Sequence, residues 1–307
     1  MAPIRIAVVG LGKIAADQHL PAIAANPAFE LAAVATKGGV PSGLAAPVAV
    51  PLFDDHRAML REVPGIDAVA VCTPPAARHP VARDALLAGK HVLLEKPTCA
   101  TLGEAEDLAG LARDVGRTAF ATWHSRFNPA VNAARAALAG RQVVRLDVQW
   151  REDVERWHPG QDWIWQPGGF GVFDPGINAL SAVTAILPDP LFVRACRLLV
   201  QPGHDTPIAA SLAFGTVHDA DLRAEFDWRP SPDIRTITVA TGDGLELSLL
   251  ASARRLLLNG VETATSGDGE YSLVYARFAT LIAAGRSDMD LAPLRLVADA
   301  LLLASRS

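Results

Sequence analysis

The first third of the chain alternates short apolar runs with stretches of helical periodicity. The apolar runs predict buried strands at residues 4–9, 31–35, 68–72, 91–94 and 118–121. The intervening stretches predict helices at residues 13–25, 57–63, 78–88 and 102–115. Thr101 and Glu104 form a capping box before the last helix, and Gly89 and Gly116 end two of the helices. This alternation with short connections predicts a parallel, doubly wound α/β sheet.

The pattern changes after about Trp123, where longer strands with alternating apolar and polar residues follow a helix at 132–139. We expect these strands at residues 143–151, 191–199, 208–214, 222–228, 235–240, 245–250 and 255–258. Alternation of this kind is typical of an antiparallel sheet with one solvent-facing side. Helices at 271–284 and 294–304 close the chain.

These patterns predict two domains. Residues 1–122 are expected to form a Rossmann domain, and residues 123–307 an α+β domain on a mostly antiparallel, open-faced sheet. The last helix is a candidate to pack back on the first domain.

Composition narrows the class of protein. Half of the 307 residues are apolar and a fifth are charged, as in a globular protein with a sizeable core. Polar residues interrupt every apolar run before it could cross a bilayer, and the N-terminus lacks a secretory signal, so we expect a cytoplasmic protein without membrane contact. The net charge of −5 argues against nucleic-acid binding. Cys72, Cys99 and Cys196 match no metal-ligand spacing, so we expect no metal and three small buried residues.

A glycine-rich turn follows the first strand. Gly10-Leu11-Gly12-Lys13-Ile14-Ala15 fits the pattern G-x-G-x-x-A at the start of a helix. Gly10 permits a tight turn, Gly12 leaves room for a pyrophosphate, and the helix start with Lys13 and Ile14 faces the phosphates. The motif predicts a dinucleotide site, and the alternative is a turn with a structural role only.

The end of the second strand bears on the type of dinucleotide. NAD enzymes carry an acidic residue there, whereas this chain has Thr36 and Lys37. A hydroxyl and a positive charge favour the 2′-phosphate of NADP, with NAD also accepted. The alternative is that Lys37 is an ordinary surface lysine.

Chemistry-bearing residues gather at two further places. The strand that begins at Val92 ends in Glu95-Lys96-Pro97, which delivers an amine to the carboxyl edge of the sheet, where ligands bind. Asp174 and Asn178 stand four residues apart and share a side if Pro175 begins a helix. In that case Asp174 could also be only the N-cap of the helix.

The chain resembles the family of glucose–fructose oxidoreductase and inositol dehydrogenase over essentially its whole length. The resemblance rests on the glycine turn, Cys72-Thr73-Pro74-Pro75 with His79, Ala88 to Val92 leading to Glu95-Lys96-Pro97, and Gly169 to Asn178. It implies that NAD(P) oxidises a sugar or polyol hydroxyl. It also implies that Lys96 and Asp174 contact that hydroxyl, and that Thr73, Pro74, His79, Glu95 and Lys96 contact the cofactor.

One position departs from the family pattern. Many members have His where this chain has Asn178, and that His is often taken as the base. An Asn cannot accept a proton at neutral pH and can only orient substrate. Either Lys96 or Asp174 would then remove the proton.

Five of the six tryptophans lie between residues 123 and 165, among histidines and carboxylates. Indole rings suit the apolar faces of sugar rings, so we expect Trp157, Trp165, His124 and His158 to contact substrate. Trp150, on an alternating strand, is expected in the core, and each histidine could instead be a structural residue. Within the family the chain is most similar to bacterial L-arabinose and D-galactose 1-dehydrogenases, which implies oxidation of an aldopyranose at C1 to a lactone.

Two alternatives remain open at this point. One is a family relative that oxidises a ring polyol, and the other is a catalytically silent NAD(P)-binding sensor. An open-faced sheet usually finds a partner, so we expect a homo-oligomer, a dimer or larger.

Overall fold

The computed structural model describes residues 2–37, 49–229, 232–265 and 269–306. The chain divides into two compact units. The first comprises Met1–Thr122 together with Gly269–Leu291, and the second comprises Trp123–Asp268 together with Ala292–Ser307. The first unit is therefore built from two separate stretches of chain.

The first unit contains a parallel sheet of six strands in the order β3-β2-β1-β4-β5-β6. The strands are β1 Ile4–Val9, β2 Phe29–Ala35, β3 Leu52–Phe53, β4 Ala68–Val71, β5 His91–Leu94 and β6 Ala119–Ala121. The predicted Rossmann architecture is confirmed. The pattern missed only β3, a two-residue edge strand that is too short to show a period.

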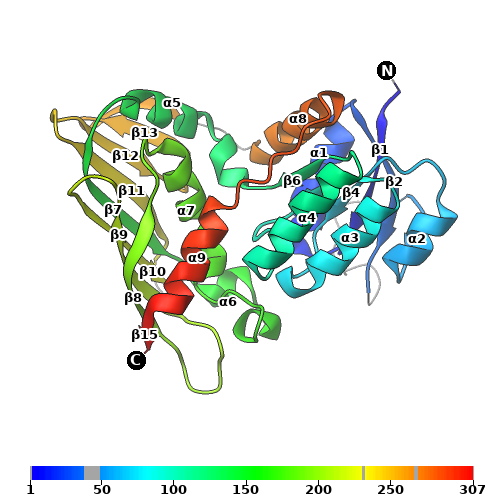
Figure 1. Cartoon of the computed structure of the whole chain (residues 1–307), viewed down its shortest axis with the longest axis horizontal. Coiled ribbons are helices and arrows are strands. Elements are labelled where there is room, and N and C mark those ends of the chain that lie inside the picture. Colours follow the sequence, from blue (N-terminus) through cyan, green and yellow to red (C-terminus); the bar gives the residue numbers. More distant parts are fainter. Residues whose placement is uncertain (1, 38–48, 230–231, 266–268, 307) are drawn as a thin grey trace. The chain divides into compact units, whose positions relative to one another are not determined.

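Helices connect these strands (Figure 1). They are α1 Leu20–Ala25, α2 His56–Glu62, α3 Arg78–Leu87 and α4 Leu102–Asp114, with a 3₁₀ turn at Pro75–Ala77 before α3. The capping box of Thr101 and Glu104 is present at the start of α4. The predicted helix at 13–25 is present, and its residues Ala15–His19 form a π-helical segment before α1. Pro21 lacks the N–H that an α-helical bond to the fourth residue before it requires, which disfavours regular α-helix there.

The returning helix α8, Glu270–Ala283, completes the first unit. The Phe278 ring stacks at 6.1 Å on Phe29 of β2 and at 6.1 Å on Phe120 of β6, and Tyr275 meets Phe29 edge-on at 5.3 Å. The last helix, α9 Ala292–Leu303, belongs to the second unit and contacts α7 and β8 there.

The second unit contains a sheet of nine strands in the order β14-β13-β12-β11-β7-β10-β9-β8-β15. The strands are β7 Val143–Arg151, β8 Phe192–Leu199, β9 Ala209–Gly215, β10 Asp221–Asp227, β11 Ile234–Thr241, β12 Glu246–Leu250, β13 Arg255–Leu258, β14 Val261–Thr265 and β15 Ala304–Arg306. Only the pairs β10–β7 and β15–β8 are parallel, so the predicted mostly antiparallel sheet is confirmed. The pattern missed β14 and β15, which are short and mostly exposed.

Helices cover one face of this sheet and leave the other open, as expected (Figure 1). They are α5 Pro129–Leu138, α7 Phe173–Ile186 and α9. On β10, Leu222, Ala224 and Phe226 are buried, whereas the residues that alternate with them are polar. A short helix, α6 Val154–Trp157, and 3₁₀ turns at His124–Phe127 and Asp162–Trp165 lie in the connections.

Three other sequence expectations concern groups outside any site. Cys72, Cys99 and Cys196 are buried free thiols, as predicted. In the described part of the chain, no helix is both long and apolar enough to cross a membrane. The described residues also hold no cluster of three or more His, Cys, Asp or Glu side chains that could bind a metal ion.

Candidate active site

The glycine turn has the geometry that a dinucleotide requires. Gly10 adopts φ +93°, and a Cβ there would lie 2.7 Å from the backbone nitrogen of Thr73. A Cβ at Gly12 would meet no atom within 4 Å, so the fold itself does not require glycine at that position. Glycine at 12 is explained by a ligand that approaches the backbone closely. The residues present therefore fit a dinucleotide.

Polar and charged groups flank this turn. The Leu11 N–H donates to Oγ1 of Thr36 at 3.2 Å, which joins the end of β2 to the turn. Lys13 forms an exposed ion pair with Asp17, and Ile14 is 37% exposed. Lys37 is exposed as well, so this edge of the sheet presents positive charge beside an apolar side chain.

Arg78, which sequence reasoning missed, joins the loops after β4 and β5. Its Nε donates to the Thr73 carbonyl at 2.7 Å, and Nη1 donates to the carbonyls of Glu95 and Pro97. Thr73 is half-buried and its Oγ1 has no partner among the described residues, whereas Pro74 is exposed. Arg78 thus fixes the loop of Thr73 against the loop of Lys96.

His79, which we expected to contact the cofactor, lies near the start of α3. Its Nε2 lies 2.8 Å from Oδ2 of Asp107, which joins α3 to α4. The side chain is 24% exposed. The ring nitrogen that could bind a phosphate is used here in a helix–helix contact.

Glu95 is the centre of a buried polar cluster in the first unit. It is 1% exposed and directly precedes Lys96, which is half-buried. Its carboxylate accepts hydrogen bonds from the Tyr271 hydroxyl at 2.5 Å and from the Lys96 backbone N–H at 2.7 Å. His19 Nε2 lies 3.2 Å from the same carboxylate. Glu95 therefore holds the Lys96 peptide in place.

His19 is fully buried, as expected of a structural residue, and its second nitrogen lies 2.8 Å from the Tyr275 hydroxyl. Burial by itself lowers the pKa of His19, but the neighbouring Cys72, Tyr275 and Glu95 together raise that pKa well above its ordinary value. Burial raises the pKa of Tyr275 to about 12, and burial and the Glu95 charge raise that of Tyr271. Both phenols therefore stay neutral, and Tyr271 donates its hydroxyl proton to Glu95.

The second unit carries Asp174 and Asn178 on α7. The helix begins at Phe173 with Val172 as its N-cap, so the interpretation of Asp174 as the N-cap is wrong. Pro175 lies inside the first turn, where its missing N–H has no helical partner to lose. Asp174 is 4% exposed and Asn178 is half-buried. Gly176 lets α7 approach the sheet, because a Cβ there would lie 2.9 Å from the Phe226 ring.

Asp174 has a partner that the sequence did not reveal. His158 Nε2 lies 3.3 Å from Asp174 Oδ2, and His158 Nδ1 lies 3.1 Å from Gln161 Oε1. Trp163 donates its indole N–H to the same Gln161 oxygen at 3.0 Å. Both nitrogens of His158 therefore contact protein groups.

The tryptophans that we expected to line a sugar site, Trp157 and Trp165, make different contacts within the second unit. The guanidinium groups of Arg156 and Arg235 lie 5.1 and 4.9 Å from the centre of the Trp157 ring. Trp165 stacks on His204 at 4.5 Å and tilts against Trp228 at 5.6 Å. Trp150 is buried, as predicted.

Trp228 and His204 were missed. Trp228 is fully buried, and its ring meets His158 edge-on at 5.2 Å. Trp228 directly follows β10, which pairs with β7, and this position was the one sequence feature that could have indicated it. His204 lies in a turn without any pattern.

His124 lies in the 3₁₀ turn that precedes α5 and is half-buried. Its neighbour Arg126 ties that turn to α7 by donating to the Ser181 carbonyl at 2.8 Å and to Oγ1 of Thr184 at 2.8 Å. The turn is therefore fixed to the helix of Asp174 and Asn178.

The expected site residues thus fall into two groups. The first unit brings together the glycine turn, Thr36, Thr73, Glu95 and Lys96. The second brings together Asp174 and His158, with Asn178 one turn further along α7.

Comparison with known proteins agrees with this architecture. The model of the oxidoreductase family with an NAD-binding Rossmann fold, GFO_IDH_MocA, matches residues 4–122. A galactose 1-dehydrogenase of Pseudomonas fluorescens is 46% identical over 307 residues, which is 100% of this chain and 97% of the relative. The chain belongs to this family.

Solved structures extend the similarity to the whole fold. The crystal structure of a D-galactose-1-dehydrogenase from Rhizobium etli has a TM-score of 0.92 at 48% identity and covers 100% of this chain and 97% of its own. The 3-ketoreductase KijD10 from Actinomadura kijaniata, in complex with NADP and TDP-benzene, has a TM-score of 0.85 at 20% identity and covers 99% of this chain and 98% of its own. The second likeness shows a shared fold only.

The raised pKa of His19 makes a prediction about stability. The folded state binds this proton more tightly than the unfolded state, so the contribution is complete below about pH 6.5 and is lost as the pH rises through the folded-state pKa. We expect the free energy of unfolding to fall over the interval above about pH 6.5, measured by urea denaturation. The raised pKa values of Cys99, about 12, and Cys196, about 11, act only at higher pH.

His19→Gln should flatten this slope. The control is His91→Gln, because the pKa of His91 is lowered by burial and therefore acts below about pH 6.5. A parent protein whose stability is constant or rises over this interval would contradict the prediction.

Proposed function

We propose that this protein is an aldose 1-dehydrogenase that oxidises the C1 hydroxyl of D-galactopyranose to the lactone, with L-arabinopyranose as a second substrate. The observation that carries the proposal is the 46% identity to galactose 1-dehydrogenase along the entire chain. The two sugars share their configuration around most of the ring and differ mainly at C5, so one pocket can accept both.

The chain supplies candidates for each chemical role. NAD(P)⁺, when bound, accepts the hydride from C1. We propose that the Lys96 amine takes the single proton of the C1 hydroxyl, with Asp174 as the alternative acceptor of that proton, and that Asn178 orients the sugar. The contacts of Glu95 and Arg78 support this assignment, because they fix the backbone that carries Lys96.

Other residues are proposed to bind without taking part in proton transfer. On the dinucleotide side they are Gly10, Gly12, Lys13, Ile14, Thr36, Lys37, Thr73 and Pro74. On the sugar side they are His124, Trp157 and Trp165, whose rings suit the apolar faces of a pyranose. His79 and Glu95 are proposed to act through structure, because both make contacts within the first unit.

A panel of substrates tests the activity. Purified protein with NADP⁺ should reduce the nicotinamide, followed by its absorbance, with D-galactose and L-arabinose but not with inositol. Reduction with inositol alone would favour the ring-polyol alternative. Cofactor binding without turnover on any aldose would favour the silent sensor.

The same assay tests Lys96. Lys96→Ala should lower turnover about 100- to 10,000-fold, the range expected on removing a general base, while cofactor binding is largely kept. The matched control is Lys90→Ala, which removes a half-buried lysine that precedes β5. Activity of Lys96→Ala within tenfold of the parent would rule out Lys96 as the base.

We propose NADP as the preferred cofactor, with NAD also accepted. The exposed Lys37 supplies positive charge directly after Thr36, and the Thr36 hydroxyl is already fixed by the Leu11 N–H. A 2′-phosphate would gain from that charge, whereas an acidic residue would repel it.

Lys37→Asp should therefore move the preference toward NAD. Loss of one charged contact to the phosphate corresponds to about a 10- to 100-fold change in the ratio of kcat/KM for the two cofactors. An unchanged ratio would show that Lys37 is only a surface charge.

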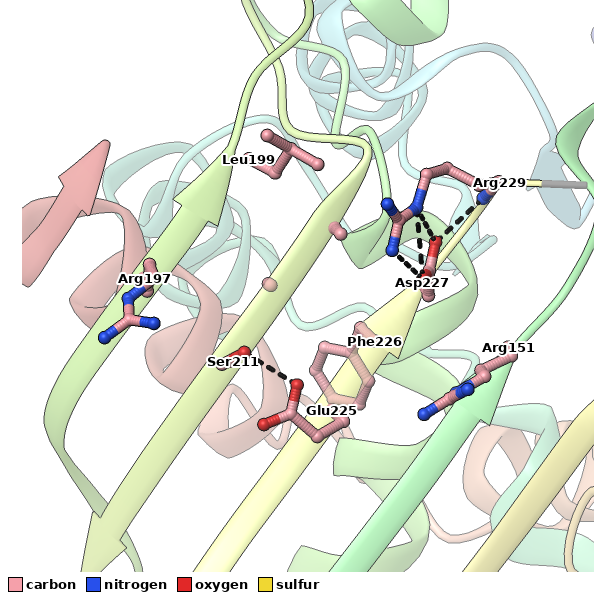
Figure 2. Close-up of a pocket in the computed structure, with 10 residues that line it drawn as sticks. Arg151, Arg197, Leu199, Ser211, Glu225, Phe226, Asp227 and Arg229 are labelled. Carbon is pink, nitrogen blue, oxygen red and sulfur yellow. Dashed lines mark hydrogen bonds and ion pairs between the residues drawn. The ribbon is translucent and has the colours of Figure 1, made fainter. Parts of the chain in front are cut away.

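We also propose a homo-oligomer that uses the open face of the second-unit sheet. The face carries a cross-strand row of Arg197, Ser211 and Glu225, in which the Ser211 hydroxyl donates to Glu225 at 2.6 Å (Figure 2). Beside it, Arg229 pairs with Asp227 at 2.6 Å around a hollow of about 230 Å³. Because positive and negative side chains alternate on this face, two copies related by a two-fold axis can pair opposite charges across the contact.

Sedimentation at micromolar concentration should give a mass of at least twice 32.4 kDa. Arg197→Glu should weaken the assembly, because it places a second negative charge in the row of Glu225. A parent protein that sediments as a monomer would contradict this proposal.

A further inference from the structure

The two oxygens of the buried Glu95 carboxylate meet different neighbours. Oε2 accepts a hydrogen bond from the backbone N–H of Lys96 at 2.7 Å. Oε1 accepts a hydrogen bond from the Tyr271 hydroxyl at 2.5 Å and lies 3.2 Å from Nε2 of His19. One oxygen therefore binds the peptide of the proposed base, and the other binds groups from distant parts of the chain.

The Tyr271 contact is the shortest of these three. A glutamate carboxylate turns easily about its terminal bond, so one oxygen keeps its place best when the other is also held. The Tyr271 hydroxyl at 2.5 Å holds Oε1 more closely than the His19 ring at 3.2 Å. Tyr271 thereby sets the direction in which Oε2 meets the Lys96 N–H.

Tyr271 is itself fixed in position and in protonation. It is 5% exposed in the first turn of α8, and its ring meets His19 edge-on at 5.0 Å. Burial and the charge of Glu95 raise the pKa of Tyr271, so the hydroxyl keeps its proton at neutral pH. The phenol is therefore a constant donor to Glu95.

Other bonds around Lys96 do not involve Tyr271. Arg78 donates to the carbonyls of Glu95 and Pro97, which flank the lysine on both sides. The Glu95 backbone N–H donates to a carbonyl of β4 at 3.1 Å. Loss of the Tyr271 hydroxyl should therefore leave the loop in place and loosen the hold on the Lys96 N–H.

We propose that Tyr271 is a positioning residue, which fixes the peptide of Lys96 through Glu95 and so sets the direction of the Lys96 amine. This rests on the proposed function, in which that amine takes the proton of the C1 hydroxyl. Proton transfer requires the acceptor to lie within hydrogen-bond reach of the proton, so a small displacement of the amine slows the reaction. A residue of α8, in the second stretch of chain that builds the first unit, thus prepares the base.

Two tyrosines of α8 allow a matched comparison. Tyr271→Phe removes the hydroxyl that donates to Glu95, whereas Tyr275→Phe removes a similarly buried hydroxyl that lies 2.8 Å from Nδ1 of His19. Each variant loses one buried hydrogen bond, so both should lower the midpoint of urea denaturation to a similar extent. Only Tyr271→Phe should affect Lys96.

The first arm measures the Lys96 backbone amide without substrate. Labelling the full-length protein with nitrogen-15 lysine gives few amide signals, because the chain has four lysines, Lys13, Lys37, Lys90 and Lys96. The signal of Lys96 is assigned by its loss in Lys96→Arg. The Lys90 amide, which donates to the Ala85 carbonyl at 2.9 Å, is the internal reference for general loosening.

Tyr271→Phe should raise the hydrogen-exchange rate of the Lys96 amide about tenfold or more, the equivalent of one hydrogen bond, and leave that of Lys90 unchanged. Tyr275→Phe should leave both rates close to those of the parent protein. An unchanged rate at Lys96, or an equal rise at Lys90, would overturn the proposal.

The second arm measures activity with NADP⁺ and D-galactose. Tyr271→Phe should lower kcat about 10- to 100-fold, the equivalent of one hydrogen bond to a charged group, with little change in KM for the sugar. Tyr275→Phe should retain the parental kcat. An unchanged kcat in Tyr271→Phe, or an equal loss in both variants, would show that Tyr271 has only a structural role.

The two arms separate this proposal from the proposed function. If the parent protein oxidises no aldose, the proposed function fails, and the exchange rate of the Lys96 amide still decides whether Tyr271 holds that peptide through Glu95.

Discussion

The first unit depends on one buried carboxylate. A buried charge without partners costs several kcal/mol, and Glu95 is stabilised by donors from its own segment and from two distant ones. These are the backbone N–H of Lys96, the Tyr271 hydroxyl on α8 and the His19 ring that follows the glycine turn. The hydrogen bond from the Lys96 backbone N–H both stabilises the buried Glu95 carboxylate and fixes the position of Lys96, the proposed base.

The two units solve similar electrostatic problems in different ways. His19 meets a carboxylate and a phenol, and a phenol can donate or accept, so a neutral ring would also be satisfied. His158 lies beside a carboxylate and meets an amide oxygen that is fixed by Trp163, so its Nδ1 must act as a donor. Two histidines beside acidic residues therefore have different consequences, and the third neighbour decides between them.

Sequence patterns predicted the parallel and antiparallel sheets, because strand periodicity and glycine or capping signals are local. They also located Lys96 and Asp174 through motifs. They did not predict the start of α7, since Pro175 is equally compatible with the first or the third helical position. They missed β3, β14 and β15 because strands of this length depend on their neighbours in the sheet. The partners Arg78, Tyr271, Gln161 and Trp228 could not be found, because each contact joins segments that no single-chain pattern connects.

The return of α8 to the first unit has a consequence for biosynthesis. Strands β1 to β6 are all made before residue 122, yet Tyr271 and Phe278 follow only much later in the sequence, on α8. Until the ribosome has made them, Phe29 and Phe120 lack their aromatic cover and Glu95 lacks one of its donors. The nascent parallel sheet must wait, incomplete, for the translation of strands β7 to β14 of the second unit. Completion of the nucleotide-binding unit during synthesis therefore depends on prior translation of most of the second unit.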